Sequence, residues 1–126
     1  MKKVIVLFIA ILLSACVGEI PSSPVQQWEG LEFRLETRPP HISPGMIEFL
    51  VIANRPGRKP ASNLLVNLRV GPTGKWVQAI EDGNVGVYRR AMRINDPSKD
   101  IMYLHIQNKD KKEGLLEFPL AYGIKP

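Results

Sequence analysis

The amino-acid sequence predicts an all-β protein, built as a single antiparallel β-sandwich of about seven strands. Three observations predict this fold class. From residue 31 onward, apolar and polar residues alternate in short segments, which is the pattern of strands with one buried face. Turns rich in glycine and proline separate those segments at roughly 10–15-residue spacing. No segment after residue 15 carries an apolar stripe at helical spacing. A small open barrel is the alternative arrangement of such strands.

The first three predicted strands share the alternation of apolar and polar side chains. Residues 31–36 alternate three apolar with three charged residues. In the most apolar stretch, residues 46–53, Glu48 sets the outward parity and thereby directs Phe49 inward. Residues 64–70 repeat the alternation. Loops containing proline separate these strands, since proline cannot continue an interior ladder.

The last four predicted strands follow turns made of glycine, proline, asparagine and aspartate. They comprise residues 75–80, 85–94, 101–106 and 115–120. Between the last two, residues 108–114 hold three lysines and two acids, which predicts a solvated hairpin tip. We therefore expect the folded domain to comprise residues 31–126.

The first 15 residues predict a secretory signal peptide. Lys2 and Lys3 give a basic start, and an apolar run of ten residues follows. This run is too short for a stable transmembrane helix, because spanning a bilayer takes about 20 apolar residues. Ser14 and Ala15 then place small residues before the chain's single cysteine. This order is typical of a signal that is removed from the mature chain.

The end of that segment, Leu13-Ser14-Ala15-Cys16, resembles the lipobox of bacterial lipoproteins. The resemblance implies a diacylglyceryl thioether on Cys16, cleavage before it and acylation of the new N-terminus. The membrane, through this lipid, would then be the protein's first partner, on the periplasmic side of the cell envelope. In such lipoproteins an aspartate after the cysteine favours the inner membrane, so Val17 favours the outer membrane. The alternative is an ordinary signal peptide with a stray cysteine beside its cleavage site.

Residues 16–30 predict a lipidated cysteine followed by a flexible tether. The segment has two prolines and no hydrophobic periodicity, which is typical of a linker. Trp28 is the one residue that does not suit a tether. It either packs under the first strand or contacts a partner.

Charge and cysteine content exclude several classes of protein. The full chain has a formal net charge of +5, and removal of the signal lowers it to +3 because Lys2 and Lys3 leave with it. This mild excess does not predict a nucleic-acid-binding protein. A single cysteine cannot form a disulfide within the chain.

No arrangement of residues predicts catalysis or a bound cofactor. The serines lie in the tether or in turns, and none stands beside His41 or His105 in an arrangement recognisable as that of nucleophilic catalysis. Glu81 and Asp82 are adjacent in a turn rather than paired across a cleft. Residues 71–75 lack the spacing of a phosphate-binding loop. We therefore expect a protein that is not an enzyme.

The order of turns resembles that of the FixH/YtkA-type periplasmic domain. The residues that carry the resemblance are Pro44-Gly45 before an apolar strand, and Asp82-Gly83-x-x-Gly86-x-Tyr88 opening a later one. The resemblance covers residues 31–120 and implies an immunoglobulin-like sandwich. Its members handle copper or assist the assembly of cytochrome oxidase. This chain departs from the copper-related members because it lacks a dense methionine and histidine cluster.

A copper site is accordingly the alternative function. Cu(I) prefers thioether and imidazole ligands, and His41 and Met46 lie five residues apart across a Pro-Gly turn. Met102 and His105 lie on opposite faces of one predicted strand, because their separation is odd. The competing interpretation is that the methionines pack in the core and the histidines lie on the surface.

Exposed arginines beside apolar side chains predict a protein-interaction module, with an envelope protein as its unidentified partner. Five residues are the candidates: Arg89 and Arg93 on the outward parity of one strand, Arg55 and Arg58 in one loop, and Tyr103, which shares a face with Ile101. Leu50 and Ile52 are further apolar residues on an outward parity. The alternative is that loops or the tether cover these residues, or that the arginines are merely solvated.

Overall fold

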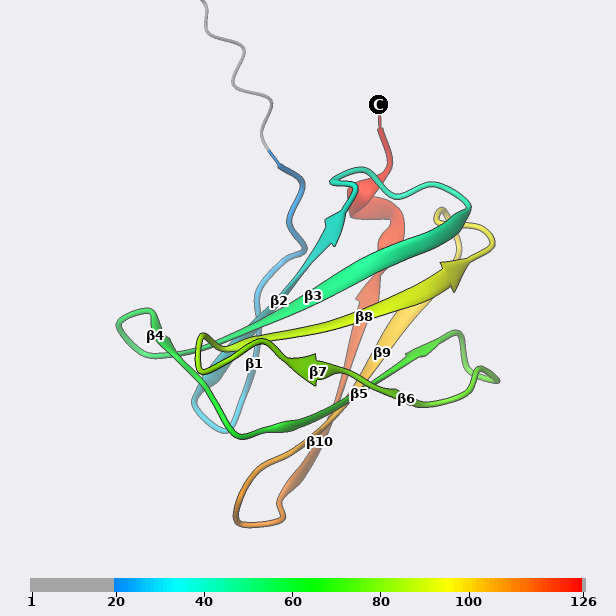
Figure 1. The fold of residues 1–126 in the computed structure, drawn as a ribbon. Coiled ribbons are helices and arrows are strands. Elements are labelled where there is room, and N and C mark those ends of the chain that lie inside the picture. The colour runs from blue at the N-terminus through cyan, green and yellow to red at the C-terminus, as the bar shows by residue number, and fades with distance from the viewer. Residues whose placement is uncertain (1–19, 126) are drawn as a thin grey trace, which may run out of the picture.

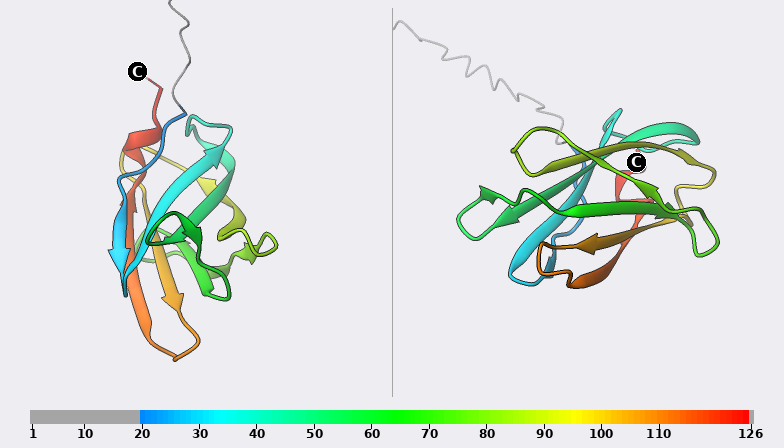
Figure 2. Two further views of the ribbon diagram at one scale, coloured as in Figure 1. Left: turned by 90° about the vertical axis from the view of Figure 1, so that its left-hand side faces the viewer. Right: turned by 60° about the horizontal axis from the view of Figure 1, so that its bottom comes forward.

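The computed structural model describes residues 20–125, so the predicted signal peptide and Cys16 lie outside the described residues. In this part of the chain two antiparallel sheets pack face to face, which confirms the all-β sandwich (Figure 1). Two further views show the sheets as separate layers, with the β9–β10 hairpin extending beyond them (Figure 2). No helix within residues 20–125 is long and apolar enough to cross a bilayer.

The first sheet contains six strands in the order β1-β2-β3-β8-β7, with β4 paired to the end of β3. Their bounds are β1 Gln26–Trp28, β2 Leu31–Arg38, β3 Gly45–Arg55, β4 Lys59–Pro60, β7 Ile80–Glu81 and β8 Val87–Ile94.

The second sheet contains four strands in the order β10-β9-β5-β6. Their bounds are β5 Leu65–Val70, β6 Val77–Gln78, β9 Ile101–Gln107 and β10 Glu113–Pro119, after which a single 3₁₀ turn, η1, covers Leu120–Gly123.

This strand order is that of an immunoglobulin-like sandwich. In such folds strands A, B, E and D form one sheet and strands G, F and C form the other. Here β2, β3, β8 and β7 take the first set of positions, and β10, β9 and β5 take the second. The expected topology is therefore confirmed, with β1, β4 and β6 as additional short strands.

The core lies between the sheets and consists of the residues on the predicted inward parity. Phe49, for example, is fully buried, as the outward position of Glu48 requires. Each long strand contributes alternate residues because successive side chains point to opposite faces. The largest fully buried side chains are Tyr88, Phe33, Phe49, Phe118, Leu35, Leu68, Ile94, Met102, Leu104, Ile106, Leu120 and Val51.

The hydroxyl of Tyr88 ties β8 to the loop that precedes β5. It donates a hydrogen bond to the Ala61 carbonyl oxygen at 2.9 Å and accepts one from the Leu64 N–H at 3.1 Å. The side chain is buried, and this burial raises the pKa of the phenol above its ordinary value. Tyr88 therefore provides a hydrogen-bond partner to two backbone groups of this loop.

Replacing Tyr88 with phenylalanine is expected to lower the free energy of unfolding by about 2 kcal/mol, because both backbone groups lose their partner inside the protein. Urea unfolding followed by tryptophan fluorescence measures the change. Tyr103→Phe is the matched control, because the ring of Tyr103 is half-buried on the outer face of the second sheet. Equal stabilities of the two variants would contradict the structural role of the Tyr88 hydroxyl.

The predicted strand at residues 75–80 is wrong as a single element. It is divided into β6, which pairs with β5, and β7, which pairs with β8 in the other sheet. Between them Ala79 is buried, and its N–H donates to the Val66 carbonyl oxygen at 2.8 Å. The chain crosses from one sheet to the other at this point. The alternation of apolar and polar residues over 75–80 therefore does not correspond to one continuous strand.

The predicted boundary between tether and domain is also wrong. Residues 26–28 form β1, which pairs with β2. Before it, Ser23 is buried, and its hydroxyl accepts a hydrogen bond from the Leu35 N–H at 2.7 Å. The Ser23 N–H in turn donates to the Leu35 carbonyl oxygen at 3.1 Å. The outer edge of β2 needs partners for its backbone groups, so the folded domain begins at Ser23.

Trp28 packs against the domain, as one of its two interpretations required. Its ring lies 6.4 Å from that of Phe33, centroid to centroid, and a β-carbon at Gly114 would overlap it. The side-chain amide of Gln26 also donates to the Glu117 carbonyl oxygen. The strand β1 thus joins β2 of the first sheet to β10 of the second.

Leu50 is not exposed, although it lies on the outward parity of β3. Only 8% of its surface is accessible, and its register partners are Glu36 on β2 and Arg89 on β8. The aliphatic parts of long charged side chains commonly cover such a residue. Leu50 therefore contributes no exposed apolar surface, and Ile52 is half-buried.

Candidate interaction surfaces

The structure does not bring the five predicted interaction residues into one patch. Arg89 and Arg93 lie on β8, on the outer face of the first sheet. Tyr103 lies on β9, on the outer face of the second sheet. Arg55 and Arg58 belong to the hairpin between β3 and β4. These residues therefore do not form one common surface.

The hairpin arginines do not act together. Arg55 lines a cleft of about 240 Å³ that also includes Glu29 and Asp110. Arg58 lines a different, larger groove of about 690 Å³ over the first sheet, beside the exposed Val85. The sequence places both arginines in one loop, but the turn directs them to different sides.

Arg89 is engaged within the molecule. Its Nε donates to Glu48 Oε1 at 2.8 Å, and its Nη1 donates to Asp82 Oδ2 at 3.2 Å. The hydrogen bonds that Arg89 donates to these two carboxylates, first that to Glu48, raise the pKa of its guanidinium. Arg89 therefore fastens β8 to β3 and to the turn after β7, and a partner would have to displace these contacts.

Arg93 and its neighbour Arg90 are exposed and differ from Arg89 in this respect. No carboxylate within residues 20–125 lies at ion-pair distance from either guanidinium. Arg90 has the inward parity of β8, so the alternation alone would assign it to the core. It is nevertheless exposed, although Tyr88, Met92 and Ile94 on the same parity are buried.

These two arginines line a groove of about 400 Å³ along the side of the sandwich. One wall of the groove is β8, and the other is formed by the end of β5, the start of β6 and the turn between them. Its basic residues are Lys75, Arg90 and Arg93, and its apolar residues include Met46, Val70 and Val77. No acidic side chain lines it. We call this site the β8 groove.

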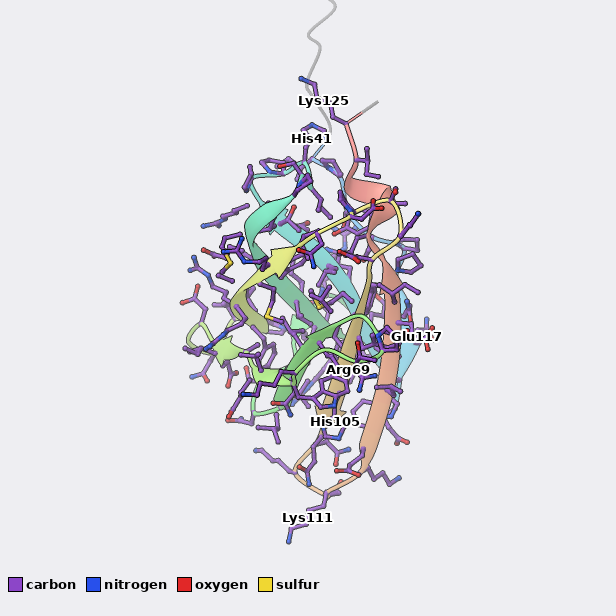
Figure 3. All side chains as sticks on the ribbon, turned by 90° about the vertical axis from the view of Figure 1, so that its right-hand side faces the viewer. His41, Arg69, His105, Lys111, Glu117 and Lys125 are labelled. Carbon is purple, nitrogen blue, oxygen red and sulfur yellow. The ribbon has the colours of Figure 1, made fainter. Side chains whose placement is uncertain are left out.

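A second cluster lies on the outer face of the second sheet. The guanidinium carbon of Arg69 lies 4.4 Å from the centroid of the Trp76 ring and 4.9 Å from that of Tyr103. The edge of Trp76 meets the ring of His105 at 6.0 Å between centroids. Figure 3 shows Arg69 and His105 on the same side of this sheet. Cation–π contacts of this kind attract the guanidinium to the faces of the aromatic rings.

Hydrogen bonds fix the histidine of this cluster. His105 Nδ1 lies 3.3 Å from the side-chain amide nitrogen of Asn67, and His105 Nε2 lies 3.3 Å from Glu113 Oε1. The buried Nε of Arg69 has no hydrogen-bond partner within residues 20–125. Because the guanidinium occupies the faces of two rings, the cluster is a self-contained stack rather than an open aromatic platform.

Sequence reasoning singled out Tyr103 but missed Arg69 and Trp76. The available signal was parity, since Arg69 and Tyr103 both lie on outward positions of their predicted strands. The register that places them side by side, Arg69 opposite Tyr103, joins β5 to β9 and is visible only in the structure.

The two candidate copper ligands lie in different surroundings. His41 is exposed in the loop before β3, at the end of the sandwich where Lys125 lies (Figure 3). A hydrogen bond of 2.8 Å from the Ile42 N–H to the Gly123 carbonyl oxygen fixes this loop. Met46 instead lines the β8 groove. Within residues 20–125, no three histidine, cysteine, aspartate or glutamate side chains gather in a way that would hold a metal ion.

Comparison of this chain with protein-family models, with curated proteins and with solved structures found no match. The function must therefore be inferred from the residues and their arrangement.

Proposed function

We propose that the mature protein is a lipid-anchored lipoprotein of the cell envelope, which binds another envelope protein without catalysing a reaction. Its anchor is the lipid on Cys16, and its location is the periplasmic side, with the outer membrane favoured. The observation that carries the binding function is the β8 groove, where three basic side chains and several apolar ones meet with no acidic residue among them.

The short segment between the lipidated Cys16 and the folded domain limits how far from the membrane a partner can be bound. Six residues, 17–22, lie between Cys16 and Ser23, where the folded domain begins. The distance from Cys16 to Ser23 is therefore at most roughly 25 Å when this segment is extended. The sandwich is therefore held much closer to the membrane than a tether ending at residue 30 would hold it. Several acyl chains on one residue anchor a protein firmly, so the partner is reached from the membrane surface.

The groove has the composition of a protein-binding surface. Arginine and methionine are enriched at protein interfaces relative to the rest of protein surfaces, and lysine is depleted there. Arg90, Arg93 and Met46 are exposed in the free protein. Arg90 and Arg93 have no ionic partner within residues 20–125, so a ligand that supplies carboxylates loses no existing ion pair on binding.

In-cell photo-crosslinking tests this function. A photoreactive amino acid at Ala91, which is exposed beside the groove, is expected to trap a discrete protein in intact cells that make the full-length chain. The same amino acid at Lys111, at the tip of the β9–β10 hairpin (Figure 3), is the control and is expected to trap none. The absence of any crosslink from Ala91, or an identical set from both positions, would reject the proposal.

A further inference from the structure

One edge of β8 is open along the groove. The Ala53 N–H donates to the Gly86 carbonyl oxygen at 2.8 Å, which identifies residues 53 and 86 as a hydrogen-bonded pair. Such pairs alternate along an antiparallel ladder, so the backbone groups of residues 88, 90, 92 and 94 face β3. Those of the intervening residues 87, 89, 91 and 93 face the opposite edge.

The strand β7 occupies only the first part of that edge. It pairs Ile80 with Arg89 and Glu81 with Tyr88, and the Asp82 N–H donates to the Val87 carbonyl oxygen. Beyond Arg89 no strand within residues 20–125 continues the sheet. The N–H and C=O groups of Ala91 and Arg93 therefore face outward along the β8 groove, in position to pair with an added strand.

The charged residues beside this edge determine which kind of side chain an added strand should carry. Arg90, Arg93 and Lys75 line the groove and have no acidic partner within residues 20–125. A second copy of this chain, paired edge to edge, would place arginines near arginines, which is unfavourable. A strand with acidic side chains instead forms ion pairs with them.

We propose that the β8 groove binds an extended acidic segment of the envelope partner, which adds to β8 as a further strand. This inference rests on the proposed binding function and names its ligand. Backbone pairing with Ala91 and Arg93 supplies direction and register, while alternate side chains of the segment contact the basic residues and the apolar ones, Met46, Val70 and Val77. Anionic lipid is the competing ligand of such a basic site, but it has no backbone groups to pair with the free edge.

Hydrogen exchange of the full-length protein in uncharged detergent micelles tests the inference. In the free protein the amides of Ala91 and Arg93 should exchange rapidly, while those of Arg90 and Met92, bonded to β3, should be protected. The probe is a blocked seven-residue peptide alternating valine and glutamate. At up to roughly millimolar concentration it should bind and slow exchange at Ala91 and Arg93.

Charge-reversal variants separate this site from general attraction between a basic protein and an acidic peptide. Arg90→Glu with Arg93→Glu is expected to weaken binding at least about ten-fold, because two attractive contacts become repulsive. Lys109→Glu with Lys111→Glu makes the same change of net charge at the far hairpin and should leave affinity within about two-fold. The four side chains are exposed, so all these variants should fold.

Three results would overturn the inference. They are no binding of the peptide, equal binding to both double variants, and binding without protection of Ala91 and Arg93. Protection of these amides by phosphatidylglycerol vesicles, with no effect of the peptide, would also overturn it and assign the groove to lipid headgroups. If the in-cell crosslink from Ala91 is observed in any of these cases, the proposed protein-binding function still stands and only the acidic-strand ligand is rejected. If no crosslink forms from Ala91, the protein-binding function itself is rejected.

Discussion

Replacing Cys16 with serine is expected to reduce the incorporation of labelled palmitate into the protein to background, because serine has no thiol for the thioether. Each buried methylene of an acyl chain contributes about 0.8 kcal/mol to membrane binding. On the proposed anchor, the loss of several acyl chains removes nearly all of the membrane affinity of the mature chain. Metabolic labelling followed by immunoprecipitation measures the effect.

Ser22→Ala is the control for this experiment. Ser22 lies in the same segment but outside the lipobox-like string, and it is exposed. Labelling of the Ser22→Ala variant should equal that of the wild type. A wild-type protein that incorporates no palmitate would contradict the lipoprotein assignment and favour an ordinary signal peptide with a stray cysteine.

Replacing Gly86 with alanine is expected to lower the free energy of unfolding by about 4 kcal/mol, a large part of the stability of a typical domain. Gly86 has φ = +71°, where a side chain is strained. A β-carbon there would overlap the Ala53 carbonyl oxygen and lie 3.0 Å from the Ala61 nitrogen. That nitrogen donates to the same carbonyl oxygen at 2.9 Å, so the substitution forces β3, β8 and the loop before β5 apart.

The matched control is Gly83→Ala. Gly83 also has positive φ, +62°, but a β-carbon there would meet no atom within 4 Å. Its replacement should cost only about 1 kcal/mol, the price of the backbone conformation alone. Urea unfolding of both variants isolates the steric contribution at Gly86. A difference below about 1 kcal/mol would show that the three segments yield easily at this point.

The strands that could be predicted are those in which apolar and polar residues alternate in step with buried and exposed positions. In β2 and β3 a shift of one residue would expose the whole apolar face, so Phe33 and Phe49 specify both the strand and its inward side. The strand β1 could not be found in this way. Its sequence, Gln26-Gln27-Trp28, does not alternate, and its stability comes from pairing with β2 and from the contact between Trp28 and Phe33.

The candidate surfaces show the same division. Parity located Arg93 and Tyr103 on outer faces, because outward positions on a half-buried strand are a local property. It would place Arg90 in the core, although that side chain is exposed, and it left Arg69 unnoticed. It also gave no sign that Arg89 would be engaged by Glu48, since residues 41 positions apart in sequence meet only when β3 and β8 pair.

By itself the sequence determined the all-β class, the main strands and their buried faces, and it supplied the basic, apolar and small-residue order that ends at Cys16. These properties are read from residues that are close together in the sequence, because the alternation of apolar and polar side chains along a strand is a local pattern. Only the tertiary structure decided where the domain begins and which arginines form ion pairs within the molecule. It alone revealed that an open edge of β8 runs beside arginines without an ionic partner in residues 20–125. Those features depend on the pairing of strands distant in sequence, because the same side chain is core, ion pair or free surface according to what the opposite sheet covers.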